Sequence, residues 1–114
     1  MLITDYSSCY IDFLLTGRPV ISFAFDYEAY MLRERGFFYE MSEVFPGPIC
    51  ENSDQLLRSL DTALGKPMDM LDQQPTYQFV TNLFHKYDDG RNAQRVVERV
   101  RTLSKTTNKN HVFN

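Results

Sequence analysis

Two short β-type runs separated by one helical segment constrain the fold of this chain more than any other feature. The first run covers Leu2 to Thr4, and the second covers Val20 to Phe25, which is continuous enough for a strand covered on both faces. Ser7 and Ser8 are residue types that cap helices, and Gly17 suits a helix end before the second run. The sequence therefore predicts strand, helix and strand, a βαβ unit.

One more short strand and four more helices are expected after this unit. They are a helix over Tyr27–Arg35 capped by Asp26, a strand at Ile49–Cys50, a helix between the cap Asn52-Ser53-Asp54 and Gly65, a helix from Pro75 that Asp88-Asp89-Gly90 breaks, and a helix over Asn92–Ser104. The last helix is expected to turn its apolar residues inward, namely Ala93, Val96, Val97, Val100 and Leu103. Residues 1–104 are thus expected to form one partial domain, followed by a flexible tail at 105–114.

The number of strands is small for this class of fold. A doubly wound sheet usually has about five or six strands, whereas this chain supplies two clear strands and a third short one. So small a sheet leaves an open edge, which proteins normally cover. We expect the chain to be a fragment, or its sheet to be completed by a missing amino-terminal domain or by another copy of the chain.

The acidic balance argues against nucleic acid as the main partner, because the formal net charge is −3 and the pI is about 5.3. Cys9 and Cys50 have neither zinc-site spacing nor a disulfide framework, so both are expected to be buried thiols in a reducing compartment. The sequence has no signal-peptide pattern, and its apolar runs are far shorter than the roughly 20 residues that cross a bilayer. We expect a cytoplasmic location.

Ser7 and Ser8 lie where a parallel strand turns into the next helix, a place that favours phosphate. Backbone N–H groups and the positive end of the helix dipole point outward there. Serine hydroxyls and amides can hold a diphosphate without a glycine-rich loop. The alternative is that Ser7 only caps the helix while Asp5 only ends the strand.

Other candidate groups are interpreted more conservatively. His85 is expected to be a half-exposed partner at a helix end, His111 lies in the tail, and no metal site is expected. The aromatic residues of the first half are interpreted as core, with base stacking as the alternative: Phe23, Phe25, Tyr27, Tyr30, Phe37, Phe38 and Tyr39. The basic carboxy-terminal end is interpreted as a solvated helix face, with an anionic membrane surface as the alternative.

An ordered set of motifs resembles the CDP-glycerol glycerophosphotransferase family. The motifs are Leu2-Ile3-Thr4-Asp5-Tyr6-Ser7-Ser8, Asp12-Phe13, Arg18-Pro19, Phe25-Asp26, Arg35-Gly36-Phe37, Pro46-Gly47-Pro48, and Asp88-Asp89-Gly90 with Arg95. The resemblance covers residues 2 to about 100. It implies an α/β fold of the glycosyltransferase-B kind, in which this chain is a partial Rossmann-like carboxy-terminal domain with a short parallel sheet and flanking helices.

The resemblance also implies a donor-binding set. It places Ser7 and Ser8 against the donor pyrophosphate, with Asp5 shaping their turn. It assigns Arg35-Gly36 to the lining of the nucleotide pocket and Asp89-Gly90 to a second loop near the donor. The set is Asp5, Tyr6, Ser7, Ser8, Arg35, Gly36, Asp89 and Gly90. For the last pair a plain turn between helices is the alternative, and Arg35 alternatively ends a solvated helix.

The implied reaction transfers glycerol phosphate from CDP-glycerol to a lipid-linked teichoic-acid-like or capsular polymer at the inner membrane face, releasing CMP without a cofactor. In the family the histidines given the base role precede the Asp-Tyr-Ser-Ser segment, so no catalytic residue is assigned and the chain alone is expected to be inactive. The alternatives are a nucleotide-sugar glycosyltransferase or epimerase fragment and a non-catalytic remnant of a truncated gene. Glycerol phosphate and ribitol phosphate both remain open as the transferred group.

Overall fold

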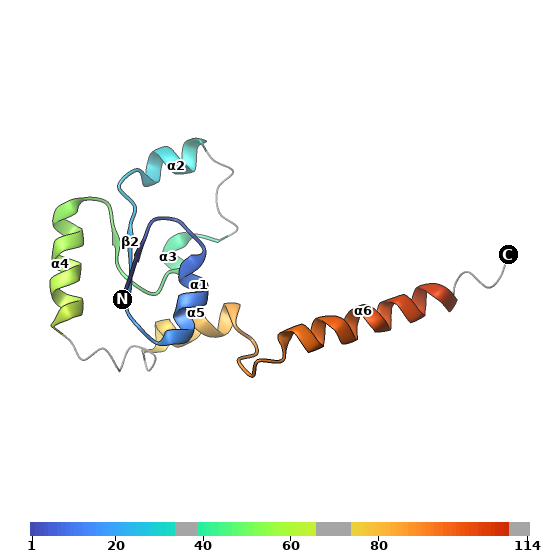
Figure 1. The fold of residues 1–114 in the computed structure, drawn as a ribbon. Helices are drawn as coiled ribbons and strands as arrows, with labels where there is room; N and C mark the ends of the chain where they lie inside the picture. The colour runs from blue at the N-terminus through green and yellow to red at the C-terminus, as the bar shows by residue number, and fades with distance from the viewer. Residues whose placement is uncertain (34–38, 66–73, 110–114) are drawn as a thin grey trace. The chain divides into compact units, whose positions relative to one another are not determined.

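The computed structural model describes residues 1–33, 39–65 and 74–109 of the 114-residue chain. The chain forms two compact units, Met1–Phe84 and His85–Asn114, and each is described by itself (Figure 1).

The first unit is built on a parallel three-stranded sheet with the strand order β1-β2-β3. The strands are β1 (Leu2–Thr4), β2 (Val20–Phe23) and β3 (Ile49–Cys50), which confirms the three predicted strands. Strand β2 ends two residues before the predicted end, because the chain turns at Ala24, whose carbonyl accepts a hydrogen bond from the amide of Tyr27 at 3.2 Å. A parallel α/β arrangement with flanking helices is therefore confirmed.

The crossover from β1 to β2 is shorter and tighter than a regular helix. Helix α1 covers Cys9–Phe13, and the 3₁₀ helix η1 covers Leu14–Thr16. Gly17 ends it in the left-handed region at φ 65, as its residue type predicts. Ser8 occupies the N-cap position but makes no side-chain capping bond.

Three further helices of the unit were predicted and one was not. They are α2 (Tyr27–Arg33), α4 (Ser53–Leu64) and α5 (Pro75–Phe84), whereas α3 (Met41–Val44) is too short and too weakly periodic to predict. The predicted cap of α4 is confirmed, since the Asn52 side chain accepts a hydrogen bond from the amide of Gln55 at 3.0 Å. The predicted end of α2 at Arg35 lies outside the described residues.

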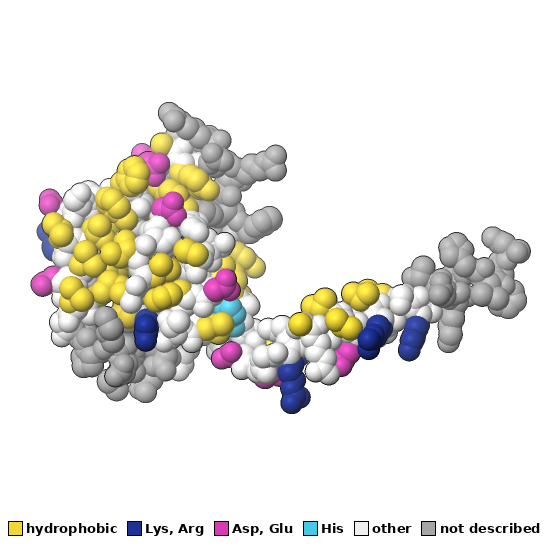
Figure 2. Space-filling view, in the orientation of Figure 1, with side chains coloured by type: hydrophobic (Ala, Val, Ile, Leu, Met, Phe, Trp, Pro, Cys, Tyr) yellow, Lys and Arg dark blue, Asp and Glu magenta, His cyan; other side chains and the backbone are white. Residues whose placement is uncertain are grey.

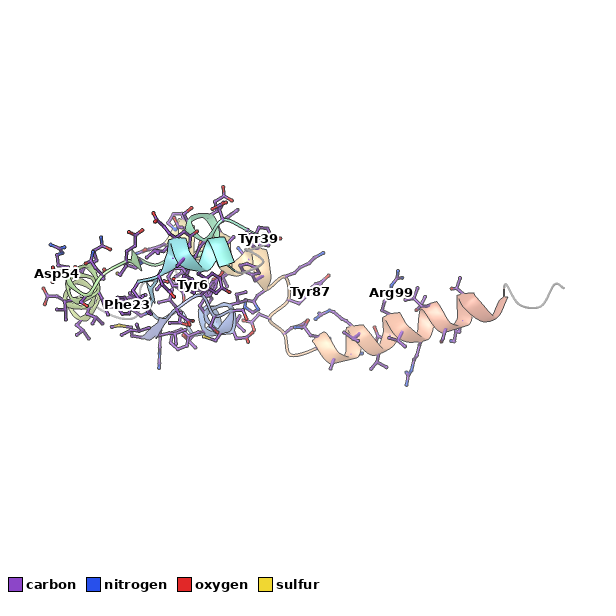
Figure 3. All side chains as sticks on the ribbon, turned by 90° about the horizontal axis from the view of Figure 1, so that it is seen from above. Tyr6, Phe23, Tyr39, Asp54, Tyr87 and Arg99 are labelled. Carbon is purple, nitrogen blue, oxygen red and sulfur yellow. The ribbon has the colours of Figure 1, made fainter. Side chains whose placement is uncertain are left out.

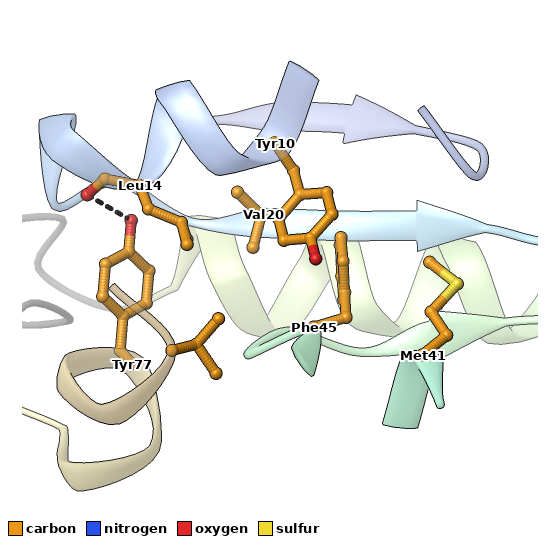
Figure 4. Close-up of a cluster of buried hydrophobic side chains, with 7 residues drawn as sticks. Tyr10, Leu14, Val20, Met41, Phe45 and Tyr77 are labelled. Carbon is orange, nitrogen blue, oxygen red and sulfur yellow. Dashed lines mark hydrogen bonds between the residues drawn. The ribbon is translucent and has the colours of Figure 1, made fainter. Parts of the chain in front are cut away.

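Helices pack on both faces of the sheet. On one face, α1, η1 and α5 enclose the main core together with residues of α3, as Figure 4 shows. Its buried side chains are Tyr10, Leu14, Val20, Met41, Phe45, Tyr77 and Val80. On the other face, α4 contacts β2 and β3, and Cys50 Sγ lies 3.4 Å from Ser59 Oγ.

Tyrosine hydroxyls connect the helices of this core. Tyr77 Oη donates to the carbonyls of Leu14, at 3.2 Å, and Arg18, at 3.0 Å, which joins α5 to the end of the first crossover (Figure 4). Tyr10 Oη donates to the carbonyl of Val44 at 3.1 Å, which joins α1 to α3. These bonds tie the helices to backbone carbonyls of neighbouring segments, and the Leu14 carbonyl also accepts a hydrogen bond from the Gly17 amide at 3.1 Å.

Some residues predicted to be buried are exposed. Cys9 is an exposed free thiol, whereas Cys50 is buried as predicted. The aromatic core interpretation is wrong for Phe25 and Tyr39, which are 66% and 51% exposed. Phe25 follows the end of β2, where alternation no longer directs side chains into the core. Figure 2 shows apolar side chains gathered on one face of this unit.

In the described part of the second unit, residues 85–109, the chain forms the helix α6 over Asn92–Lys109. The helix continues five residues beyond the predicted end at Ser104, so the segment predicted as a flexible tail begins inside it. Its apolar residues were expected to face inward, and this expectation is wrong: Val96, Val97, Val100 and Leu103 are 47–62% exposed.

Candidate functional site

The segment Asp5–Ser8 and Asp26 lie at the same edge of the sheet. Strands β1 and β2 are parallel neighbours in which Thr4 pairs with Ser22, so both chains leave the sheet at their carboxyl ends on one side. This edge is where ligands bind in open α/β sheets. The predicted donor turn therefore has the location that its proposed role requires.

Asp5 shapes the turn from inside. One carboxylate oxygen accepts a hydrogen bond from the amide of Ser7 at 2.9 Å. The Asp5 carbonyl accepts another, at 3.1 Å, from the hydroxyl of the fully buried Ser22. These bonds fit the turn-shaping part that the resemblance implies for Asp5, and they also occupy the Ser7 amide within the turn.

The two serine side chains of the turn differ in their hydrogen bonds. Ser7 Oγ accepts a hydrogen bond from the amide of Cys9 at 3.3 Å, and the Ser7 side chain is also hydrogen-bonded to the Cys9 thiol. Ser8 is exposed, and its side chain makes no capping bond. Because α1 has only five residues, hydrogen bonding from this turn matters more than a helix dipole.

Tyr6 supports the turn through its contacts with Asp26 and Tyr30. Its hydroxyl donates to Asp26 Oδ1 at 2.6 Å, and its ring stacks on Tyr30 with centroids 4.3 Å apart and an interplanar angle of 18°. Partial burial, and then the hydrogen bond to Asp26, raise the pKa of the Tyr6 phenol. Tyr6 thus joins the turn after β1 to the start of α2, and Figure 3 shows it lying beside that helix.

Cys9 lies directly after the serine turn and was not predicted to be accessible. Its thiol is 3.5 Å from Thr4 Oγ1. Hydrogen bonding to Ser7, and then to Thr4, lowers the pKa of the Cys9 thiol. The acidity of the Cys9 thiol therefore depends on the hydrogen bonds of the serine turn.

Asp89 and Gly90 belong to the second unit, where they form the turn before α6. The two terminal guanidinium nitrogens of Arg95 donate to the Asp89 carboxylate, with Nη1 at 2.8 Å from Oδ1. The guanidinium carbon of Arg95 lies 3.9 Å from the centroid of the Tyr87 ring. The side-chain hydrogen bond from Arg95 lowers the pKa of the Asp89 carboxyl to about 2. Gly90 has φ 70, a conformation that suits glycine in a turn, and the donor-loop role of Asp89 and Gly90 stays a prediction.

Four further predicted residues lie outside the serine turn or outside the described part of the chain. Arg35 and Gly36 lie outside the described residues, as does His111, and His85 is half-buried at the start of the second unit. Over residues 1–33, 39–65 and 74–109, no three His, Cys, Asp or Glu side chains gather in a way that would hold a metal ion. In the same ranges no helix is both long and apolar enough to cross a membrane.

Two residues at this edge were missed as site residues. Ser22 is the polar residue in an otherwise apolar strand, and this signal indicates a buried hydrogen bond rather than a surface position. Asp26 was predicted only as a helix cap, although its carboxylate binds Tyr6. That pairing joins residues twenty apart in sequence, so local pattern alone does not reveal it.

The chain matches known proteins of teichoic acid synthesis over most of its length. It is 28% identical over 103 residues to the teichoic acid poly(ribitol-phosphate) polymerase of Bacillus spizizenii, which covers 88% of this chain and 15% of that protein. It is 30% identical over 99 residues to the teichoic acid glycerol-phosphate transferase of Staphylococcus aureus, covering 87% of this chain and 25% of that protein. It is 35% identical over 98 residues to the teichoic acid ribitol-phosphate polymerase TarL of the same species, covering 85% of this chain and 16% of that protein.

These relatives are several times longer than the region they share with this chain, which spans 15–25% of their lengths. No solved structure is significantly similar to the chain. Residues 1–102 match the family described as CDP-Glycerol:Poly(glycerophosphate) glycerophosphotransferase. Because this match extends from the sheet and the serine turn into α6, the chain belongs to the CDP-Glycerol:Poly(glycerophosphate) glycerophosphotransferase family.

Proposed function

We propose that this chain is the donor-binding part of a glycerophosphotransferase that takes CDP-glycerol. The observation that carries the proposal is the turn after β1, where Ser7 and Ser8 are exposed while Asp5 is held against the Ser7 amide. The family match supports the reaction class. On this proposal the sheet is the core of a Rossmann-like domain of the glycosyltransferase-B type.

Hydrogen bonds from the turn would hold the donor diphosphate. When the donor binds, the Ser7 hydroxyl turns its proton from the Cys9 thiol to one phosphate oxygen while it still accepts from the Cys9 amide, and the Ser8 hydroxyl donates to another. Bonds to charged phosphate oxygens are stronger than neutral ones. Turning the Asp5 carboxylate toward the Ser7 amide keeps its negative charge partly satisfied beside the anionic ligand.

In this scheme the chain binds and orients the donor, and the acceptor hydroxyl attacks the glycerol-bearing phosphorus with CMP as the leaving group. Arg35 and Gly36 line the nucleotide. No residue of this chain is assigned as the base. Two of the relatives are named for ribitol phosphate and one for glycerol phosphate, so the group beyond the cytidine diphosphate is the least constrained part of the proposal.

The experiment is donor binding measured by calorimetry and thermal shift. CDP-glycerol should raise the melting temperature of the chain, and Ser8→Ala should weaken binding by about tenfold or more, because a hydrogen bond to a charged group contributes about 1.5–3 kcal/mol. Ser53→Ala on α4, which packs on the other face of the sheet, is the matched control and should leave affinity unchanged.

Parallel titrations with CDP-ribitol and a UDP-sugar define the donor class. Stronger stabilisation by the UDP-sugar than by either CDP donor would overturn the proposal in favour of a nucleotide-sugar transferase. Equal binding of CDP-glycerol and CDP-ribitol would support diphosphate binding by the serine turn. It would also show that the chain does not select glycerol over ribitol.

A further inference from the structure

Asp26 presents an exposed carboxylate at the same edge of the sheet as the serine turn. It follows β2, whose end is fixed because the amide of the fully buried Ala24 donates to the carbonyl of Cys50 at 2.7 Å. The Asp26 carbonyl accepts a hydrogen bond from the amide of Tyr30 at 2.8 Å, so the backbone is held on the other side as well. Asp26 is therefore a charged group on a fixed backbone, at the edge where ligands bind in open α/β sheets.

The side chain of Asp26 is oriented by its own contact with the turn. Its Oδ1 accepts a hydrogen bond from the hydroxyl of Tyr6 at 2.6 Å, and Tyr6 immediately precedes Ser7. The Tyr6 ring, labelled in Figure 3, stacks on Tyr30 with centroids 4.3 Å apart. A side chain that is already oriented loses less freedom when it binds a ligand. The bond also brings the carboxylate next to the turn that holds Ser7 and Ser8.

The charge of Asp26 indicates which part of a donor it can contact. A carboxylate repels a diphosphate and only accepts hydrogen bonds, so its favourable partners are hydroxyl and N–H groups. It accepts about four bonds, of which Tyr6 provides one. Asp5, a second carboxylate at this edge, is turned toward the Ser7 amide. Asp26 is thus suited to a hydroxyl-bearing group beside the diphosphate.

The position of Asp26 along the chain supports the same partner. In dinucleotide-binding folds the phosphate turn follows the first strand, and an acidic residue about 20 residues further on binds a ribose hydroxyl. Here Tyr6 of the serine turn and Asp26 are 20 residues apart, and they follow the parallel neighbours β1 and β2. Serines replace the glycine-rich turn of those folds, so the likeness lies in the placement of the acid.

We propose that Asp26 is a specificity-determining residue that accepts hydrogen bonds from a vicinal diol of the donor. This inference rests on the proposed function, because it concerns the same donor at the same turn. CDP-glycerol carries a vicinal diol on each side of its diphosphate, one on the ribose and one on the glycerol. Two neighbouring hydroxyls match the two oxygens of a carboxylate, which have lone pairs to spare beyond the bond from Tyr6.

The test is calorimetry of the full chain with three donors that differ only in their hydroxyls. They are CDP-glycerol, the n-propyl ester of CDP, which keeps the charge and the three-carbon group without its diol, and 2′-deoxy-CDP-glycerol, which lacks the ribose diol. The wild type should bind CDP-glycerol about tenfold more tightly than at least one analogue, because a hydrogen bond to a charged group is lost. The analogue whose disadvantage disappears in the Asp26 variants identifies the diol.

Asp26→Asn separates recognition of the diol from support of the turn. The amide oxygen still accepts from Tyr6, whereas the charge that strengthens bonds to hydroxyls is gone. The preference over the weaker analogue should fall from about tenfold to about threefold, since a neutral acceptor gives roughly half the free energy of a charged one. The weaker analogue itself should bind as well as before or better, because a negative charge beside the diphosphate is removed.

Asp26→Ala removes both the charge and the acceptor, and it should abolish the preference. Glu28→Gln is the matched control, because Glu28 is an exposed acid two residues further along the chain, and the preference should survive in it. Each preference is a ratio of two affinities measured on one variant, so it does not depend on the folded fraction of that variant. The ratio therefore decides the question even if Asp26→Ala lowers stability.

Three results would overturn the proposal. They are equal binding of all three donors by the wild type, an unchanged preference over both analogues in Asp26→Ala, and an equal loss for all three donors in Asp26→Ala that Tyr6→Phe reproduces. The last result would show that Asp26 acts only through Tyr6. If the wild type bound none of the three donors, the proposed function itself would be wrong and this inference with it.

Discussion

The hydroxyl of Tyr6 lies 2.6 Å from Oδ1 of Asp26, and this bond joins the two turns that leave the carboxyl edge of the sheet. Tyr6 belongs to the turn after β1, and Asp26 follows β2 immediately before α2. The stacked ring of Tyr30 holds Tyr6 from the α2 side. The shape of the serine turn therefore depends on a side chain pair rather than on the backbone alone.

Tyr6→Phe removes this bond and keeps the stacked ring. We expect the free energy of unfolding in urea to fall by about 1 kcal/mol, less than the roughly 1.5–3 kcal/mol of a buried bond to a charged group, because the pair is only partly buried. Tyr39→Phe is the matched control, since Tyr39 is 51% exposed and should change little. Equal stability of Tyr6→Phe and the wild type would show that the ring stack alone holds the turn.

Tyr77→Phe tests the connection between α5 and the first crossover. It removes one buried hydroxyl that donates to two carbonyls, those of Leu14 and Arg18. The Leu14 carbonyl keeps the hydrogen bond from the Gly17 amide at 3.1 Å, so the loss is that of the hydroxyl donor, and we expect about 0.5–1.5 kcal/mol in urea unfolding. A loss below about 0.5 kcal/mol would contradict the structural weight given to this tyrosine.

Gly47→Ala should damage the sheet more than any other glycine change in the described chain. A Cβ at Gly47 would lie 1.8 Å from the carbonyl oxygen of Val20, a backbone atom that cannot move away without shifting β2. We expect a loss of at least about 2 kcal/mol, measured by thermal and urea unfolding. Gly65→Ala is the control, because Gly65 has φ −79, which any residue adopts, and it should change stability by less than about 1 kcal/mol.

The sequence predicted the βαβ unit, the third strand and the helices α4 and α5, because each has local signals: an apolar run, a cap or a glycine end. It did not predict α3, which has only four residues, or the true end of α6. The direction of the α6 valines was also wrong, since periodicity identifies one apolar face and not what covers it.

The candidate site also has parts that the sequence predicted and parts that it did not. The location of Ser7 and Ser8 and the turn-shaping role of Asp5 follow from neighbouring residues. The bonds from Tyr6 to Asp26 and from Ser22 to the Asp5 carbonyl join the turn after β1 to β2 and to the segment that follows it. Such pairs depend on the register of β1 and β2, which a single sequence does not provide.

Cys9 provides a chemical probe of the serine turn. The hydrogen bond to Ser7 is the largest cause of its lowered thiol pKa. Ser7→Ala should therefore raise the pKa of Cys9 and slow its alkylation by iodoacetamide at neutral pH, because the thiolate is the reacting form. The measurement is the pH–rate profile of Cys9 modification by mass spectrometry, and buried Cys50 should stay unmodified in the folded chain.

Ser8→Ala serves as the control for this probe, because the Ser8 side chain makes no capping bond in the turn. It should leave the Cys9 profile unchanged. Saturating CDP-glycerol should protect Cys9 in the wild type if the donor covers the turn. An identical profile in Ser7→Ala and the wild type would rule out Ser7 as the cause of the low thiol pKa.

The ion pair between Asp89 and Arg95 stabilises the start of α6 at neutral pH, and this stability is lost in acid. The guanidinium hydrogen bonds lower the pKa of the Asp89 carboxyl to about 2, below its unfolded value of about 3.9. The folded state therefore favours ionised Asp89, so the pair contributes stability above pH of about 4 and loses it as pH falls toward about 2.

Carboxyl carbon shifts in an NMR titration measure the pKa of Asp89 directly. Arg95→Gln should move it up toward the ordinary value, whereas Arg91→Gln should not, because Arg91 donates to Asp89 through its backbone amide at 3.1 Å. An unshifted Asp89 in Arg95→Gln would mean that the backbone of the turn, and not the arginine, sets its acidity.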